Sequence, residues 1–381
     1  MSHDILQMMD QWGPEKVVCV SDRRSGMRGV LVIDNTARGM GKGGTRMSPS
    51  LSINEVSRLA RTMTWKWAAI DLFFGGAKAG ILGDPTASGK EAVLRAFARR
   101  LSNEVPKEYV FGLDMGLSEP DVAIFIDELG DRGASAGLPS ALGGLPYDEL
   151  GVTGFGVAEA ADSAAETIGL PMRGARVTIQ GLGAVGIAAA KRFDELGAVV
   201  VAISTAKGTL HTPEGLDIDA LAKLREKLGD DCVTGYSNKS LPVGAELRVP
   251  TDILVPSARE DMIDVNVAKS LDVKLVVEGA NMPTTKEAKL VLHARGIPVV
   301  PDFIANAGGV VAAVYTMGSR YSPFRPDTEQ VFSTVAEKMR HNAATVLLRA
   351  QSWSSTPYEA ALRLAQERVL ASMELRGQVT I

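Results

Sequence analysis

Two lysines lie inside one of the most apolar stretches of the chain, "WKWAAIDLFFGGAKAGI", residues 65–81. Lysine is rarely buried without a partner, so Lys66 between two tryptophans and Lys78 after a glycine pair need an explanation. Desolvation or a neighbouring cation lowers the pKa of an ammonium group and makes it useful in catalysis near neutral pH. We therefore expect one lysine to hold a substrate carboxylate and the other to act on the reacting carbon. The alternative is that both side chains extend to solvent along their apolar stems.

Two further segments place a charged residue among glycines or at a turn. "GMGKGGTRM" carries Lys42, and "FGLDMG" carries Asp114 directly after an apolar run. A carboxylate beside ammonium groups can take a proton from an amine and return it. We expect the glycines around Lys78 to leave space for a substrate, and Asp114 to move protons to and from an amine beside the lysines. A flexible surface loop around Lys42 and a plain turn at Asp114 are the alternatives.

A glycine-rich segment, "VTIQGLGAVG", has the spacing G-x-G-x-x-G directly after a strand-like run and before an alanine-rich helix. Such glycines permit a tight turn and a close approach of the backbone to a pyrophosphate, and the amino end of the helix favours an anion. We expect this loop to bind a dinucleotide through Gly181, Gly183, Ala184, Val185 and Gly186. The alternative is a tight turn that only packs.

The next strand-like run, "AVVVAIS", should end at the residue that contacts the ribose of the dinucleotide. An acidic residue at this place holds the 2′-hydroxyl of NAD, but this chain has Ser204, Thr205 and Lys207. Small hydroxyls with a lysine nearby can accommodate a 2′-phosphate. The expected cofactor is therefore NAD or NADP, with NADP favoured, and an exposed turn that still admits NAD is the alternative.

The segments that must position these residues alternate between strand-like and helical patterns. Runs such as "KVVCVSD" and "GVLVIDN" predict strands, and "SINEVSRLARTMTWKWAA", with Ser52 as its N-cap, predicts a helix that ends near Lys66. The later apolar runs "TDILVPSA", "VKLVVEGAN" and "IPVVPDFIANAGG" are typical of parallel strands covered on both faces. We predict an α/β protein with a substrate-binding domain at 1–145, a Rossmann-type dinucleotide-binding domain at 146–325, and C-terminal helices at 326–381 that return to the first domain.

The composition sets outer limits on function. The 381 residues carry a net charge of −4, which gives no reason to expect nucleic acid or an anionic membrane as a partner. Two cysteines, Cys19 and Cys232, and four scattered histidines lack the spacing of metal ligands, so no metal site is expected. No apolar run reaches about 18 residues, and the first residues lack the pattern of a signal peptide. We therefore expect a cytoplasmic protein.

Nine segments, in order along the chain, resemble the motifs of the glutamate/leucine/phenylalanine/valine dehydrogenase family. They are "GKGGTRM", "MTWKWA", "GGAKAGI", "GLDMG", "VTGFGV", "GLGAVG", "DILVPSA", "EGANMPTT" and "NAGGV". The resemblance implies a homo-oligomeric two-domain enzyme with its active site in the cleft between the domains. It also implies NAD(P)-dependent, reversible oxidative deamination of an L-amino acid to a 2-oxo acid and ammonia.

The resemblance also implies roles for single residues. Lys66 matches the lysine that binds the substrate α-carboxylate. Lys78 matches the lysine that activates the attacking water and stabilises charge on the carbinolamine, and Asp114 matches the aspartate that exchanges protons with the amine. On the cofactor side, Thr153 and Asn281 fall where the family contacts the nicotinamide and its ribose.

Further positions of the matched segments bear on the substrate. Asn306 lies on the loop that approaches nicotinamide and substrate, and Gly43 and Val310 are expected to line the substrate site. Lys42 matches the lysine by which glutamate-specific members bind the side-chain carboxylate, but Ala313 stands where those members have a serine.

The expected substrate is thus glutamate or another polar amino acid. Met63 replaces a glutamine, as in leucine-type members, so an apolar or unusual amino acid is the first alternative. Less favoured alternatives are a malic-enzyme-like oxidoreductase and a non-catalytic nucleotide-binding regulator.

Overall fold

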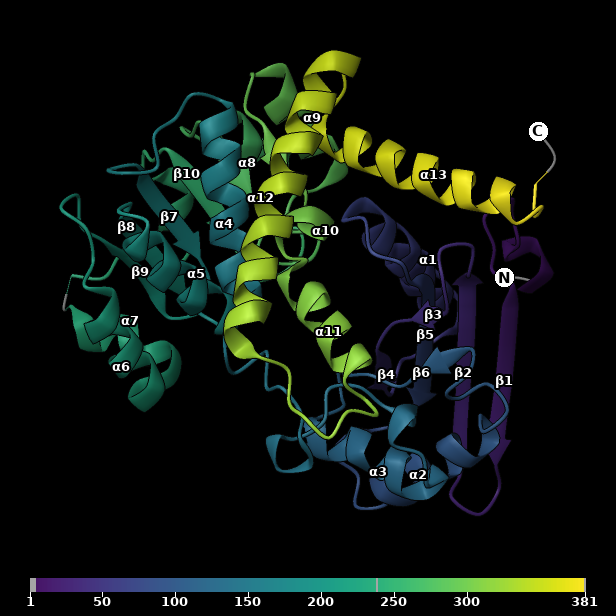
Figure 1. Cartoon of the computed structure of the whole chain (residues 1–381). Helices are drawn as coiled ribbons and strands as arrows, with labels where there is room; N and C mark the ends of the chain where they lie inside the picture. The colour runs from purple at the N-terminus through teal and green to yellow at the C-terminus, as the bar shows by residue number, and fades with distance from the viewer. Residues whose placement is uncertain (1–4, 238, 380–381) are drawn as a thin grey trace. The chain divides into compact units, whose positions relative to one another are not determined.

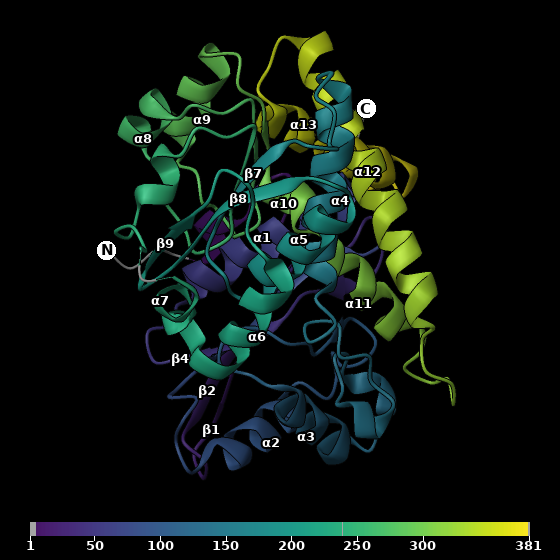
Figure 2. The ribbon, with the colours of Figure 1, turned by 90° about the vertical axis from the view of Figure 1, so that its left-hand side faces the viewer.

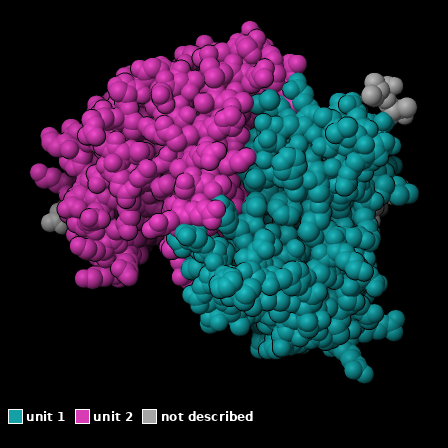
Figure 3. Space-filling view, viewed as in Figure 1, with its two compact units in different colours: residues 1–146, 313–328, 364–381 teal, residues 147–312, 329–363 magenta. Residues whose placement is uncertain are grey.

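The computed structural model of this protein describes residues 5–237 and 239–379. The chain forms two compact units, which Figure 3 shows in two colours. Their bounds are 1–146, 313–328 and 364–381 for unit 1, and 147–312 and 329–363 for unit 2. Each unit has its own sheet with helices packed against it, so the predicted α/β fold class is confirmed.

Unit 1 contains a mixed six-stranded sheet in the order β1-β2-β5-β3-β6, with β4 beside β5 (Figure 1). Its strands are β1 (Lys16–Asp22), β2 (Met27–Asn35), β3 (Gly41–Lys42), β4 (Thr45–Ser48), β5 (Gly75–Leu82) and β6 (Tyr109–Val110). β2 pairs antiparallel with β1 and β5, whereas β5 pairs parallel with β3 and β4. β5 therefore lies inside the sheet, with strands on both of its sides.

Different helices cover the two faces of this sheet. Successive side chains of a strand point to opposite faces, so Val30 and Val32 of β2 pack with α1, while Leu31 and Ile33 join the cluster that contains Phe97 of α2. The helices of unit 1 outside its C-terminal part are η1 (Ile5–Met8), α1 (Ile53–Ala69), α2 (Lys90–Arg100), α3 (Glu119–Leu129), η2 (Arg132–Ala134) and η3 (Ser140–Leu142). Burial on both faces holds the sheet in a fixed register.

The helix predicted before Lys78 is confirmed as α1. Its N-cap is Ser52, whose hydroxyl oxygen accepts a hydrogen bond from the backbone N–H of Glu55 at 3.2 Å. Lys66 lies in the last turn, as predicted. The glycine-rich segment that follows is strand β5.

Unit 2 contains a six-stranded sheet in the order β12-β11-β10-β7-β8-β9, parallel except for β9. Its strands are β7 (Arg176–Gln180), β8 (Val199–Thr205), β9 (Gly208–His211), β10 (Ile253–Pro256), β11 (Leu275–Val277) and β12 (Val299–Val300). The chain continues from β7 to β8 on one side and later to β10 on the other. In open α/β sheets, ligands bind at the carboxyl ends of the strands where the chain changes direction in this way, which here is the end of β7.

The helices of unit 2 connect and cover these strands, and Figure 2 shows α4 and α5 beside β7 and β8. They are α4 (Val152–Thr167), α5 (Ala184–Glu195), α6 (Ile218–Leu228), η4 (Gly229–Asp231), α7 (Cys232–Tyr236), η5 (Ala245–Arg248), α8 (Val265–Ser270), α9 (Lys286–Ala294) and α10 (Asp302–Ala305). The strand predicted around residue 300 is only two residues long. It ends at Pro301, which lacks the N–H that a longer ladder needs.

The last helices are α11 (Gly308–Gly318), α12 (Thr328–Trp353) and α13 (Pro357–Leu375). α12 packs against α4: the ring centroids of Phe155 and Phe332 lie 4.8 Å apart, edge to face, and Arg340 pairs with Glu159 at 3.5 Å. Residues 329–363 therefore group with unit 2, whereas the sequence placed all of 326–381 on the first domain.

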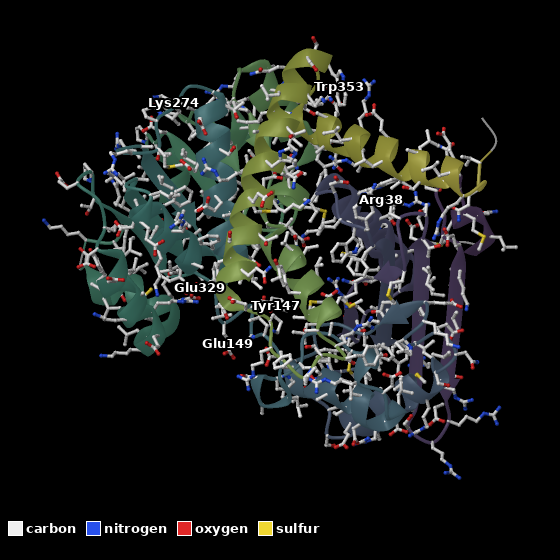
Figure 4. The ribbon with its side chains drawn as sticks, viewed as in Figure 1. Arg38, Tyr147, Glu149, Lys274, Glu329 and Trp353 are labelled. Atoms are coloured by element: carbon white, nitrogen blue, oxygen red, sulfur yellow. The ribbon has the colours of Figure 1, made fainter. Side chains whose placement is uncertain are left out.

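The remaining C-terminal residues do return to unit 1. Arg368 of α13 donates hydrogen bonds to the carbonyls of Ala68 and Ala69 at 2.8 Å each, at the carboxyl end of α1. A cation there complements the helix dipole. At the other end of α13, the ring of Trp353, labelled in Figure 4, lies 4.2 Å from the Arg363 guanidinium within unit 2.

Across residues 5–237 and 239–379, no helix has the length and apolar character needed to cross a membrane.

Candidate active site

Lys78 occupies the middle of β5, where it pairs with Val32 of β2. Its side chain is buried, with the residue 7% exposed. The glycines around it do not leave space for a substrate, contrary to our expectation. A Cβ added to Gly76 would lie 2.0 Å from the Thr64 hydroxyl oxygen, and one added to Gly80 would lie 2.6 Å from Leu51. Because these glycines and Gly75 have no side chains, neighbouring segments of the protein can pack closely against β5.

An ion pair joins Lys78 to the second predicted catalytic residue. The Lys78 ammonium lies against Asp114 Oδ2, and the Arg46 guanidinium lies 3.3 Å from Asp114 Oδ1. Arg46 is itself held by Glu55 of α1 at 2.7 Å. The structure thus brings Lys78 and Asp114 together, with an arginine on the other oxygen of the same carboxylate.

The charge environment keeps Asp114 ionised. Burial by itself would raise the pKa of this carboxyl, but the Lys78 ammonium and the Arg46 guanidinium outweigh that effect and hold the pKa below its usual value. A carboxylate in this state can accept a proton from a substrate amine.

Lys42 lies in the two-residue strand β3, between β5 and β6. The residue is 4% exposed, and its Nζ donates to the carbonyls of Val110 and Phe111 at 3.3 and 3.4 Å. Burial, together with the charges of Arg320 and Lys78, lowers the pKa of Lys42 to about 7. Among the described residues, no carboxylate lies within ion-pair distance of this ammonium.

The residues next to Lys42 leave little freedom. A Cβ on Gly43 would lie 1.8 Å from the Ala77 carbonyl oxygen, and one on Gly112 would lie 2.7 Å from Lys42 Nζ. The Trp67 indole N–H donates to the Lys42 carbonyl at 3.0 Å. β3 is therefore fixed between α1 and β5, and a side chain at Gly112 would displace the Lys42 ammonium.

Lys66 is half-buried in the last turn of α1.

The predicted phosphate loop joins β7 to α5 in unit 2. Gly181 has φ of +91°, and a Cβ on Gly186 would lie 1.9 Å from the Gly181 carbonyl oxygen, so the turn requires both glycines. By contrast, a Cβ on Gly183 would meet nothing within 4 Å. Gly183 is the N-cap of α5, and no side chain caps that helix.

This loop fits the diphosphate of a dinucleotide. The N–H groups that open α5, at Ala184 and Val185, have no capping side chain, and the helix amino end favours negative charge. The open surface over Gly183 lets a ligand reach them. The residues present are thus suited to hold a diphosphate by backbone N–H groups.

The predicted ribose contacts lie at the end of β8, beside this loop. The Ser204 hydroxyl oxygen accepts from the Gly181 N–H at 3.3 Å, and the Thr205 hydroxyl donates to the Asp230 carbonyl at 2.8 Å. Both side chains are thus tied to the protein, while Lys207 is exposed in the turn between β8 and β9.

A second group of predicted residues comes together in unit 2. The Asn306 side-chain amide donates to Asn281 Oδ1 at 3.0 Å and to the Ala280 carbonyl at 3.3 Å. Thr153 lies near the start of α4, where a Cβ on Gly309 would be 2.7 Å from its hydroxyl oxygen. Along α11, Val310 belongs to unit 2 and Ala313 to unit 1.

Comparison with known proteins identifies the group of enzymes to which this architecture belongs. The family model for Glutamate/Leucine/Phenylalanine/Valine dehydrogenase matches residues 143–377, and the model for the Glu/Leu/Phe/Val dehydrogenase dimerisation domain matches residues 14–131. The chain belongs to this family. It is an amino acid dehydrogenase, as the family resemblance of its motifs predicted.

Individual relatives agree over most of the chain. The glutamate dehydrogenase of Thermotoga maritima is 35% identical over 363 residues, which cover 92% of this chain and 86% of that protein. The NADP-specific glutamate dehydrogenase of Saccharolobus shibatae is 32% identical over 98% of this chain and 92% of its own length. The crystal structure of glutamate dehydrogenase from Peptoniphilus asaccharolyticus superposes with a TM-score of 0.85 at 30% identity, covering 96% of this chain and 92% of that one.

Two charged residues of this dehydrogenase lie beside the predicted ones but were not predicted from the sequence. Arg46 stands inside the motif "GKGGTRM", and its charge could have suggested a partner for Asp114. Arg320 follows α11 and acts on Lys42 through its charge. Only the fold brings Arg320 near β3, since no motif links the two segments.

Among the described residues, no three His, Cys, Asp or Glu side chains form a group that could hold a metal ion.

Proposed function

We propose that this amino acid dehydrogenase catalyses the reversible oxidative deamination of an L-amino acid with an acidic side chain, with glutamate as the first candidate. The observation that carries the choice of substrate is the buried Lys42 ammonium. It donates only to two backbone carbonyls, and no carboxylate of the described chain neutralises it. A buried cation is costly without an anion. A substrate side-chain carboxylate would supply that anion.

The chemistry of deamination fits the pair in unit 1. When bound, the nicotinamide dinucleotide accepts a hydride from the substrate α-carbon. Asp114, held ionised by Lys78 and Arg46, takes a proton from the substrate ammonium before that step. Lys78 then orients the water that attacks the carbon of the resulting iminium ion and stabilises the charge on the carbinolamine, while the protons of that water pass to solvent. Asp114 returns its proton to the departing ammonia.

Lys66 completes the substrate side of this proposal. Lys66 lies in the last turn of α1, the helix that packs against β5, the strand of Lys78. We assign it the substrate α-carboxylate, which leaves Lys42 for the side-chain carboxylate.

The cofactor is a nicotinamide dinucleotide, held at its diphosphate by the loop of Gly181, Gly183 and Gly186. Thr153, Asn281 and Asn306 are assigned to the nicotinamide end. NADP is the favoured form, because Lys207 is exposed at the end of β8 and no acidic residue ends that strand. The relative from Saccharolobus shibatae, by its name, is specific for NADP.

Two measurements test the proposal. The first follows reduction of NAD and of NADP with L-glutamate, L-aspartate, L-leucine, L-valine and L-phenylalanine, and the reverse reaction with ammonia and the matching 2-oxo acids. The highest kcat/KM is expected for L-glutamate with NADP. A higher kcat/KM for the apolar amino acids would overturn the acidic substrate, and a preference for NAD would overturn only the form of the cofactor.

The second measurement uses two variants, one that tests substrate binding and one that tests cofactor binding. Lys42→Met removes the ammonium and should lower kcat/KM for L-glutamate by about tenfold to a hundredfold, because a hydrogen bond to a charged group contributes about 1.5–3 kcal/mol. Lys207→Ala should raise KM for NADP more than KM for NAD. An unchanged substrate profile in Lys42→Met would remove this residue from the site.

The dimerisation-domain match over residues 14–131 supports a homo-oligomer as the functional state. Light scattering after size-exclusion chromatography should give a mass that is a multiple of 40.3 kDa. A single-chain mass at micromolar concentration would contradict this.

A further inference from the structure

Two cations of unit 1 are anchored to neighbouring backbone segments but have no anionic partner of their own. Lys42 Nζ donates to the carbonyls of Val110 and Phe111. Arg320 donates through Nη1 to the Gly133 carbonyl at 2.6 Å and through Nε to the Met317 carbonyl at 3.0 Å. In the part of the chain that the structure describes, neither side chain forms an ion pair within 4 Å.

The segments that hold these cations are bonded to each other. The Phe111 N–H donates to the Ala134 carbonyl at 2.9 Å, and the Ala136 N–H donates to the Phe111 carbonyl at 2.9 Å. Met317 packs into the same place, in a cluster with Val110 and Ala136. Gly133, whose carbonyl holds Arg320, is thus followed directly by Ala134, which is bonded to Phe111, and the Phe111 carbonyl in turn holds Lys42.

The charges are close enough to influence each other. Arg320 is the first of the two cations whose charge adds to burial in lowering the pKa of Lys42. Burial also lowers the pKa of Arg320, against the charges of Tyr321 and Asp131. Asp131 is already engaged, since its Oδ1 accepts from the Tyr321 hydroxyl and from the Gly133 N–H at 3.0 and 2.7 Å.

One nitrogen of the Arg320 guanidinium, Nη2, donates no hydrogen bond to the described residues. The other two nitrogens, Nη1 and Nε, are used by protein carbonyls. A guanidinium held in this way is fixed in place and still presents N–H groups to an incoming carboxylate.

We propose that Arg320 is a specificity-determining residue, whose guanidinium, together with the Lys42 ammonium, selects a substrate side chain that ends in a carboxylate. The proposal rests on the function proposed above and adds the group that reads the acidic side chain. Arg320 lies two residues beyond Gly318, the end of α11, on the connection that follows the helix carrying Ala313. In the family resemblance, Ala313 stands where glutamate-specific members use a serine. The Arg320 guanidinium supplies a charged donor to the substrate side chain in place of that hydroxyl.

The test compares Arg320→Met with Arg325→Met. Arg325 is a matched control, since it lies on the same connection and also donates to a carbonyl, that of Ser140 at 2.9 Å, but does not act on Lys42. Binding of glutarate and of pentanoate, which differ in one carboxylate, is measured by titration calorimetry on the full chain. Turnover of L-glutamate and L-norvaline is measured in parallel.

We expect the wild-type protein to bind glutarate more tightly than pentanoate. Arg320→Met should reduce this preference by about tenfold to a hundredfold and raise KM for L-glutamate more than KM for L-norvaline, with a smaller effect on kcat. Arg320→Lys should restore part of the preference, and Arg325→Met should keep all of it.

Three other results would count against the proposal in distinguishable ways. If Arg320→Met weakens both ligands equally and lowers the melting temperature, Arg320 only braces Gly133 and Met317, and the acidic substrate stands without it. If Arg320→Met leaves the preference for glutarate intact, Arg320 does not read the side chain. If the wild-type protein itself shows no preference for glutarate or L-glutamate, the acidic substrate and the role of Arg320 are both overturned.

Discussion

The guanidinium of Arg46 lies 3.3 Å from the carboxylate oxygen of Asp114 that faces away from Lys78. The carboxylate is thus flanked by two cations of different kinds. The arginine keeps a permanent positive charge beside the proposed base. Together with Lys78, it lowers the acidic end of the pH range in which Asp114 can accept a proton.

Arg46→Met should narrow that range from the acidic side. Removing the guanidinium removes one of the charges that lower the pKa of Asp114, so the pKa rises and the acidic limb of kcat/KM shifts to higher pH. The shift is read from a pH profile between about 4 and 9 with saturating cofactor. Arg58→Met is the control, because Arg58 is exposed on α1 and forms no ion pair among the described residues. A limb that stays in place in Arg46→Met would show that Lys78 alone controls Asp114.

Sequence patterns were sufficient to predict the local elements of this fold. The glycine loop, the strand before it and the helix after it appear where the spacing placed them, because a tight turn and a helix start depend on residues close together in the chain. Ser52 caps α1 for the same reason. The pairing of Lys78 with Asp114 followed from matching each motif to the family, not from any local pattern.

The features that were missed depend on contacts between distant segments. The glycines of β5 indicated empty space, but Thr64 of α1 fills the space next to Gly76. Helix α12 could not be assigned to a unit from its own pattern, since its partner is α4, with Phe332 against Phe155. The lowering of the Lys42 pKa by the charge of Arg320 likewise depends on a contact between segments that are far apart in the sequence.

Lys42→Met should stabilise unit 1, even though it harms the proposed substrate site. The pKa of Lys42 in the folded protein is about 7, whereas the ordinary pKa of an exposed lysine is 10.5. Below pH 7 the folded state carries a buried charge at full cost, and the cost declines as pH rises from 7 towards 10.5, where the unfolded chain binds the extra proton. The gain in the free energy of unfolding should thus be about 1–3 kcal/mol at pH 6 and smaller at pH 9.

Urea denaturation followed by tryptophan fluorescence measures this gain. A Trp353→Phe background removes the tryptophan of unit 2, so that the signal comes from Trp12, Trp65 and Trp67 of unit 1. Equal stability of the two proteins at pH 6 would show that the carbonyls of Val110 and Phe111 satisfy the charged lysine fully.

Two glycines of the phosphate loop should respond differently to alanine. A Cβ on Gly186 would lie 1.9 Å from the Gly181 carbonyl oxygen, so Gly186→Ala must displace the turn and should lower both stability and dinucleotide affinity. Gly183→Ala meets nothing within 4 Å and has an ordinary backbone conformation, so its stability should change by less than about 0.5 kcal/mol.

Gly183→Ala should still weaken dinucleotide binding, because its methyl group covers the N–H groups at the start of α5. Calorimetric titration with NADP gives the affinity, and thermal melting gives the stability of each variant. Normal affinity in Gly183→Ala would move the diphosphate away from the start of α5.

Glu278 should hold in shape the loop that carries Asn281. This carboxylate is 0% exposed, and its Oε2 accepts from Lys289 Nζ and from the Asp302 N–H, both at 2.9 Å. The loop begins at the next residue, Gly279, and Asn306 donates to it. Glu278→Ala leaves the Lys289 ammonium buried without its carboxylate, which costs about 3–5 kcal/mol.

Local opening of this loop is measured by hydrogen exchange over residues 275–306, and dinucleotide affinity by titration. Glu278→Ala should speed exchange and weaken binding, whereas the double variant Glu278→Leu/Lys289→Met, which removes both charges, should recover most of the protection. Burial raises the pKa of Glu278 to about 6, above the ordinary glutamate value of 4.5, so between these pH values the folded state binds a proton that the unfolded chain has released. The contribution of this carboxyl to the free energy of unfolding therefore declines as pH increases from 4.5 through 6, and the double variant should lack that decline. Unchanged exchange in Glu278→Ala would mean that Asn306 alone maintains the loop.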